Sequence, residues 1–424
     1  MILTIVQIIF IVLILLSIYK RDISIFLFIV FLPLNTILPS SYNLFGYISY
    51  TNILFSIAFY HLLVWKDRQF PLTQFRKIAI IISVIFLSYL VYSDIRHDIL
   101  GILPMYKDYN GYVDSLRELL RWGPVMLLIF KIDREYFEKV IFKGILLAVI
   151  ILVFSGAFAV PLSALGFKIE YLAEFEYSEY RQHIDMPIFM RNSGFVSGGD
   201  FNVLGATYNM IIAFILCYFN FKKILNTPSI ILCLIFSVIG VILTGSRMAF
   251  ITLFLTVILF SLQTRSIEKI TKYLAFFIIV IGVIYMFGML DFILERLKFQ
   301  NTLSEISFST RASRANRWLS YLTYSTSRIN RFLFGYDSVH YFIGHQFVDS
   351  HNLYLRMLYY GGFSFVLLLL IQIYRLIRIM LSGKLQFPLL TILFPCFIST
   401  MIISQHTWIY YLLLIISINN FEDE

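Results

Sequence analysis

The sequence predicts an all-α, polytopic integral membrane protein with about 12 to 13 transmembrane helices and a long extracytoplasmic loop between late spans. Only 14% of its 424 residues are charged, whereas soluble domains average about 25%. Its mean hydropathy is +0.81, and apolar residues recur in runs of roughly 17 to 22, the length of helix that crosses the hydrocarbon core. A β-barrel would instead need alternating segments of about 10 residues.

The apolar runs are taken in order as candidate spans. They are 1–18, 23–39, 46–65, 78–93, 115–130, 141–162, 201–219, 228–244, 249–262, 273–290, 353–374, 387–404 and 406–418. The first run has no basic n-region and no small-residue cleavage site, so we interpret it as a retained span. The last run is short enough for a re-entrant segment.

We divide the chain into four parts along these runs. They are N-terminal helices at 1–162, central helices at 163–290, an extracytoplasmic loop with short helices at 291–352, and C-terminal helices at 353–424. No internal repeat is visible, which disfavours a transporter built from inverted repeats.

Lysine and arginine orient these spans, because short cytoplasmic connections carry an excess of positive charge. Every odd-numbered connection is basic, and the short even ones at 40–45 and 405–407 carry neither residue. The basic sets are Lys20/Arg21, Lys66/Arg68/Arg76/Lys77, Lys131/Arg134/Lys139, Lys222/Lys223, Arg265/Lys269/Lys272 and Arg375/Arg378/Lys384. We therefore expect a membrane protein with the C-terminus in the cytoplasm and with 94–114, 163–200 and 291–352 outside.

Charge and cysteine content exclude two other kinds of site. The net charge of +9 fits loops that face lipid phosphates, so no nucleic acid partner is expected. The cysteines Cys217, Cys233 and Cys396 lie within apolar runs without metal-ligand spacing, as small packing residues do. No acidic metal motif stands out in the outer loops, so we expect neither a metal nor a cofactor.

The cations of the predicted outer side are arginines, apart from Lys107, Lys168 and Lys298. Arginine presents a planar fork that binds phosphate oxygens in pairs and stays charged in partly dry sites. This excess indicates an anionic ligand at the bilayer edge, most simply a lipid-linked diphosphate. The alternative is that these side chains snorkel to ordinary lipid headgroups.

Two segments before the long loop contain candidate ligand-binding residues. Arg247, in ILTGSRMAFITLF, lies between two spans with almost no loop around it, and an ionisable residue so close to hydrocarbon is a candidate functional residue. Arg191 and Asn202 belong to RNSGFVSGGDFNVLGATYN, whose glycines permit close backbone approach and anion nests. The alternative for Arg247 is that it only marks a tight turn between two spans. The alternative for the second segment is an ordinary glycine-rich connection that leads into a span.

The loop at 291–352 contains a second set of arginines. Arg311, Arg314 and Arg317 recur every three residues in STRASRANRW, a spacing typical of one helix face. They fit either diphosphate binding or an interfacial amphipathic helix.

The loop ends at a histidine that can act as a general base. His351 and Asn352 begin HNLYLRMLYYGGFSF, with Arg356 about one turn further in and inside the membrane. A histidine titrates near neutral pH, and asparagine can orient it or bind sugar hydroxyls. The alternative is that His351 is an ordinary polar residue at the end of a helix, with no catalytic role.

The order of these motifs resembles the bacterial O-antigen ligase and polymerase superfamily. The motifs are RNSGFVSGGDFNVLG, LTGSRMAF, STRASRANRW, FLFGYDS and SHNLYLRMLYYGGF, within about 185–370. In the ligase pattern nine residues separate the His-Asn pair from a glycine, which is Gly362 here. After two further residues the pattern has Gly, Thr or Tyr, where this chain has Phe365.

The resemblance implies a metal-independent, inverting glycosyltransferase of the multi-span type in the bacterial inner membrane. Its glycan would be carried on undecaprenyl diphosphate at the outer face. We expect a polymerase of O-antigen or capsule repeat units, with a chain-length regulator as a candidate partner. The runner-up is a ligase that transfers finished glycan to lipid A core or protein, and a membrane transporter is the alternative of another class. The expected catalytic residues are His351, Arg247 and Arg314, and the expected substrate-binding residues are Arg191, Asn202, Arg311, Arg317, Asn352 and Arg356.

Overall fold

The computed structural model describes much of the N-terminal half of the chain and parts of the rest. The described residues are 2–34, 37–43, 48–66, 73–99, 111–169, 194–195, 201–220, 227–264 and 353–379, with single positions at 271, 275, 278, 282, 285 and 333. This part is helical and contains no strand, which confirms the predicted helical class.

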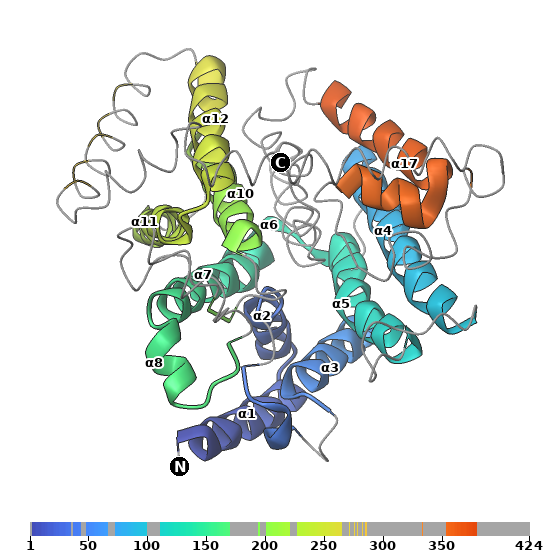
Figure 1. Ribbon diagram of the computed structural model, residues 1–424, viewed down its shortest axis with the longest axis vertical. Coiled ribbons are helices and arrows are strands. Elements are labelled where there is room, and N and C mark those ends of the chain that lie inside the picture. The colour runs from blue at the N-terminus through green and yellow to red at the C-terminus, as the bar shows by residue number, and fades with distance from the viewer. Residues whose placement is uncertain are drawn as a thin grey trace, which may run out of the picture. The chain divides into compact units, whose positions relative to one another are not determined.

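The helices follow the predicted apolar runs (Figure 1). They are α1 Ile2–Tyr19, α2 Arg21–Phe31, the 3-10 turn η1 Ser40–Tyr42, α3 Tyr50–Val64, α4 Gln74–Ile99, α5 Gly111–Lys131, α6 Arg134–Tyr136, the π-helical turn η2 Phe137–Ile141, α7 Phe142–Ala157, α8 Ala159–Ala164, α10 Phe201–Asn220, α11 Thr227–Thr244, α12 Arg247–Thr264 and α17 Leu353–Ile379.

Three helical stretches of the described part are long and apolar enough to cross a membrane, namely Ile2–Tyr19, Phe137–Ala157 and Gly361–Ile379. Shorter apolar stretches occur at Tyr50–Val64, Leu204–Leu216, Pro228–Thr244 and Met248–Ser261. These stretches support membrane association, and the larger number of spans stays a prediction.

Local chemistry shortens or divides several predicted spans. The run at 23–39 forms a helix only to Phe31, because Pro33 has no backbone N–H with which to continue the helical hydrogen bonds. The run at 141–162 is divided between α7 and α8 at Phe158, whose backbone leaves the helical region at φ −106° and ψ 23°.

Contacts divide the chain into two compact units. Unit 1 comprises Met1–Ile145, Arg311–Leu385 and Cys396–Glu424, and unit 2 comprises Leu146–Thr310 and Gln386–Pro395. In unit 1, α2 packs against α1 and α3, while α4 packs against both α5 and α17. Its aromatic core includes Phe28 against Phe55 and Phe86 stacked on Trp122.

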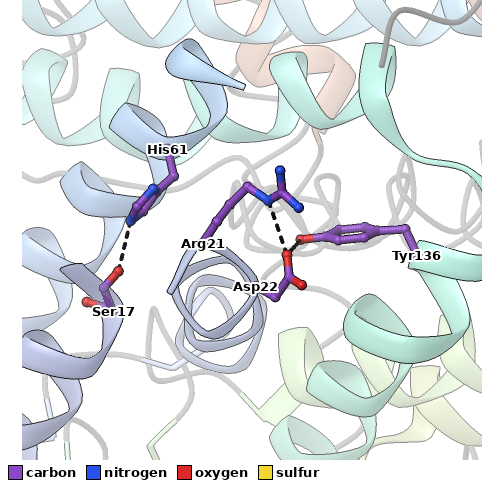
Figure 2. A network of polar contacts seen from close by, with 5 residues as sticks. All are labelled: Ser17, Arg21, Asp22, His61 and Tyr136. Atoms are coloured by element: carbon purple, nitrogen blue, oxygen red, sulfur yellow. Dashed lines mark hydrogen bonds and ion pairs between the residues drawn. The ribbon is translucent and has the colours of Figure 1, made fainter. Parts of the chain in front are cut away.

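The first three basic connections meet at one end of unit 1. Figure 2 shows Arg21 and Tyr136 pointing at the Asp22 carboxylate, and His61 pointing at the backbone of Ser17. The His61 Nε2 lies 2.9 Å from the Ser17 carbonyl oxygen. The Arg21 guanidinium also lies over the Trp65 ring, 4.1 Å from its centre.

Two buried cations strengthen the same end of unit 1. Lys131 donates to the carbonyls of Leu62 and Trp65, where α3 ends and its last carbonyls need donors. Arg76 donates to the Ile132 carbonyl at 3.2 Å. Connections one, three and five therefore share one end, as expected for helices that run alternately up and down.

Candidate functional site

Two of the predicted site segments meet at one end of unit 2. Tyr208 of α10 packs over Gly240 of α11, while Gly205 lies beside Thr244, so α10 and α11 are antiparallel. The short turn after Thr244 reverses the chain, and α12 then runs parallel to α10. The start of α10, the end of α11 and the start of α12 thus share one end. We call Phe201–Gly205 with Thr244–Ala249 the α10/α12 end.

The turn that precedes Arg247 is tightly specified. Gly245 has a left-handed φ of 54°, which favours glycine. The Ser246 N–H donates to the Thr244 hydroxyl at 3.3 Å, and the Ser246 hydroxyl accepts from the Ala249 N–H at 3.4 Å. Ser246 therefore caps α12, and Arg247 occupies its first position.

A buried amide fixes α12 against α10. The Asn209 side chain donates to the Gly205 carbonyl at 3.0 Å and to the Ala249 carbonyl at 2.8 Å, and Asn209 is buried. A Cβ on Gly205 would lie 2.5 Å from the Ala249 Cβ, so the two backbones are in close contact. Asn202 lies at the start of α10 and Arg247 at the start of α12. The contacts of Gly205 and Asn209 with Ala249 hold these two helix starts close together.

The glycine-rich segment also packs against a helix of unit 2. The Phe195 N–H donates to the Ser155 hydroxyl near the end of α7 at 3.1 Å, and Gly194 has a φ of 58°. A Cβ on Gly194 would lie 2.5 Å from the Ser155 hydroxyl oxygen. Close packing therefore explains Gly194 and Gly205 without a ligand. Arg191 comes three residues before Gly194 and lies outside the described residues.

Helix α17 departs from the predicted continuous span at 353–374. Its backbone breaks at Gly362, with φ 75° and ψ 179°, a conformation that is essentially restricted to glycine. Figure 1 shows α17 as two segments that meet at an angle. The apolar stretch runs over Gly361–Ile379, so Arg356 belongs to the segment before the break and not to the interior of this span.

Most of the predicted site residues are not described structurally. Six of them lie outside the described residues, namely His351, Asn352, Arg191, Arg311, Arg314 and Arg317. For Asn202, Arg247 and Arg356 the structure describes the backbone alone. Asn202 and Arg247 belong to unit 2, and Arg356 belongs to unit 1. Their chemical roles stay predictions. Among the described residues, no three His, Cys, Asp or Glu side chains group as metal ligands.

A polar cluster on α5 is a feature that the sequence analysis missed. The Glu118 carboxylate accepts from the Arg121 guanidinium at 2.9 Å, and Glu118 is buried together with Ser115 and Trp122. The signal was visible in the sequence, because two opposite charges lie three residues apart inside the predicted span 115–130. Ionisable residues inside a span are candidate functional residues.

Comparison with known proteins found no match for this chain among protein-family models or among curated proteins. A functional assignment therefore rests on the residues and on the geometry described above.

Proposed function

We propose that this protein is a polysaccharide polymerase. It transfers a glycan from undecaprenyl diphosphate to a hydroxyl of another lipid-linked repeat unit, at the outer face of the bacterial inner membrane. The acceptor oxygen attacks the anomeric carbon, the bond from that carbon to the diphosphate oxygen breaks, and the configuration inverts. The acceptor proton passes to a base, and the lipid diphosphate leaves with the electron pair.

The observation that carries this proposal is the α10/α12 end of unit 2. Two helix N-termini and Arg247 belong to this end, and helix N-termini carry backbone N–H groups and a partial positive charge. An arginine in the first turn adds a bidentate donor for phosphate oxygens. The arrangement supports binding of an anionic leaving group, whose developing charge it would stabilise.

The remaining roles come from the sequence. His351 is the proposed general base for the acceptor hydroxyl, and Arg314 is a second group on the diphosphate. Arg191, Asn202, Arg311, Arg317, Asn352 and Arg356 are proposed to bind the substrate. Fixed guanidinium groups take the part that a divalent cation plays elsewhere, so the reaction needs no metal.

A polymerase is preferred to a ligase because of Phe365. The ligase pattern has Gly, Thr or Tyr at this position, whereas Phe365 here packs against Gly361 and the Tyr89 ring. Its lack of a polar atom and its packing favour a structural role.

Deletion of the gene, followed by gel analysis of surface glycan, tests the proposal. A polymerase predicts loss of the ladder with a single repeat unit retained. Total loss of glycan from the core, with lipid-linked polymer accumulating, would instead identify a ligase, and an unchanged ladder would refute both.

Complementation with Arg247→Lys tests the diphosphate contact. Lysine keeps the charge but loses the planar fork, so we expect it to restore only a small part of the ladder. Arg375→Lys is the matched control, because Arg375 is exposed near the end of α17. Full activity of the Arg247 variant at normal protein level would leave the diphosphate contact unsupported.

A further inference from the structure

A group of cationic residues gathers beside Trp65, at the end of unit 1 that Figure 2 shows. The Arg21 guanidinium lies over the Trp65 ring, 4.1 Å from its centre, and the Arg21 side chain is 37% exposed. Lys20 and Lys66 are the sequence neighbours of Arg21 and Trp65, and both are exposed. The contact between Arg21 and Trp65 therefore brings three cationic residues from two connections close together. We call Lys20, Arg21 and Lys66 the basic cluster.

The guanidinium of the basic cluster is held in place by its neighbours. The Arg21 Nε donates to the Asp22 carboxylate at 3.1 Å. The buried Trp65 ring under the guanidinium packs in turn on Tyr136, with ring centroids 5.1 Å apart. The bond to Asp22 uses Nε, so the two terminal nitrogens keep N–H groups of the kind that bind phosphate oxygens.

Positive charge exceeds negative charge at this end of unit 1. The three connections that meet here, 20–22, 65–77 and 131–139, contain nine Lys and Arg and five Asp and Glu, a net charge of +4. Two of the carboxylates already pair with cations, Asp22 with Arg21 and Glu135 with Lys139. An anionic group beside the basic cluster would therefore be attracted.

Exposed apolar surface adjoins the basic cluster. Tyr19, directly before Lys20, is 84% exposed, and Leu63 and Val64, just before Trp65, are 58% and 54% exposed. The apolar stretch Ile2–Tyr19, long enough to cross a membrane, ends directly before Lys20. Cations and aromatic rings at the end of an apolar helix are typical of the boundary between the hydrocarbon core and the lipid headgroups.

Charge and apolar surface together indicate the chemistry of the ligand. A free phosphate ion or an acidic protein segment would match the cations but would leave the apolar residues uncovered. A zwitterionic lipid would cover the apolar residues but would gain little from the net positive charge. An anionic phospholipid matches both, because its acyl chains cover the apolar surface and its phosphodiester binds the cations.

We propose that the basic cluster is a binding site for the headgroup of an anionic phospholipid. Arg21, Lys20 and Lys66 bind the phosphodiester oxygens, and the acyl chains lie along the exposed residues at the ends of α1 and α3. This site belongs wholly to unit 1. The inference depends on membrane association and is independent of the proposed polymerase activity.

The test is lipid binding to the full-length protein in detergent, followed by native mass spectrometry. The probes are dioleoyl phosphatidylglycerol, which is anionic, and dioleoyl phosphatidylcholine, which has the same chains and a zwitterionic headgroup. Phosphatidylglycerol is expected to bind more tightly. Lys20→Gln and Lys66→Gln should each weaken its binding about fivefold, the effect of one cation at a membrane surface. Both side chains are exposed, so folding should be unaffected.

Lys77→Gln is the matched control, because it removes the same charge from an exposed position on α4 at the same end of unit 1. Weaker phosphatidylglycerol binding in the Lys20 and Lys66 variants, with normal binding in the Lys77 variant, supports the site. Equal weakening in all three variants would show a general effect of surface charge and overturn it, as would equal affinity of the wild-type protein for the two lipids.

Two further probes distinguish the other occupants. Inorganic phosphate is added at constant ionic strength, and displacement of phosphatidylglycerol by it would identify a site for a free anion. A polyglutamate peptide is titrated in the same way, and tighter binding of this peptide than of the lipid would assign the surface to an acidic protein segment. Either result overturns the lipid site, and failure of both probes to compete supports it.

Discussion

Replacement of Gly205 by alanine is expected to push α12 away from α10 at the proposed diphosphate site. The added Cβ would lie 2.5 Å from the Ala249 Cβ and 3.7 Å from the Ala249 Cα. The Ala249 Cα is a backbone atom and its Cβ is bonded directly to it. Neither atom can move aside unless the backbone of α12 moves. Since carbon atoms pack at about 3.5 to 4.0 Å, the helices must separate locally by about 1 Å.

The energetic effect has two parts. Insertion of a methyl group into a close-packed contact costs about 1 to 3 kcal/mol. A separation of about 1 Å also lengthens the 2.8 Å bond from Asn209 to the Ala249 carbonyl beyond hydrogen-bonding range, which removes about 1 kcal/mol more. The higher helix propensity of alanine returns up to about 1 kcal/mol. We therefore expect a net destabilisation of about 1 to 3 kcal/mol.

The assay measures thermal unfolding in detergent together with the glycan ladder of a complemented deletion strain. Gly205→Ala should lower the unfolding temperature and shorten the ladder, because a shift of about 1 Å in a binding group can reduce a rate by about 100-fold. Gly282→Ala is the matched control, since a Cβ there meets nothing within 4 Å.

A compensating change tests the geometry itself. Ala249→Gly removes the atom that the new methyl group meets, so the double variant should recover much of the stability and activity lost in Gly205→Ala. An unfolding temperature and ladder that are normal in Gly205→Ala would refute the close contact between α10 and α12. Failure of the double variant to recover would show that the loss has another cause.

Three further changes test other parts of the molecule. Gly362→Ala should cost about 1 to 3 kcal/mol, read as a lower unfolding temperature than that of Gly282→Ala, because its φ of 75° and ψ of 179° suit only glycine. Tyr136→Phe should cost about 1 kcal/mol, because it removes a 3.2 Å bond to the Asp22 carboxylate, and a double-mutant cycle with Asp22→Asn measures the coupling. Burial, followed by the charge of Asp22, raises the pKa of Tyr136, so this stabilisation should persist at neutral pH and decline only above the unfolded-state pKa of about 10. His351→Ala should reduce chain extension about 10²- to 10⁴-fold at normal protein level, with a milder effect from His340→Ala, and a normal ladder would remove His351 from the mechanism.

Local sequence was sufficient for the helices and for the position of one turn. The runs predicted at 228–244 and 249–262 correspond to α11 and α12 within a few residues. Glycine and serine before Arg247 indicate a tight turn because they supply a left-handed backbone and a helix cap. Proline at position 33 could likewise have predicted the early end of α2, since its missing N–H is a local property of the sequence.

The candidate site was predictable only in part. Charge and spacing single out Arg247 because an arginine beside apolar runs is costly wherever the chain folds. The break at Gly362 was not predictable, because two adjacent glycines permit a non-helical backbone without requiring it. The charges of Glu118 and Arg121 were visible inside the predicted span, but a run of mixed apolar and charged residues does not say which of its side chains are buried.

The sequence by itself therefore determined the helical class, the apolar stretches and the residues with the chemistry to bind an anion. These properties depend on composition and on neighbours within a few positions of the chain. Only the tertiary structure decided that Asn209 bonds to Ala249, 40 residues away, and that the leucines of α5 face outward while Glu118 is buried. Such pairings depend on which helices pack together, and many apolar faces are interchangeable until close contacts such as Gly205 against Ala249 select one arrangement.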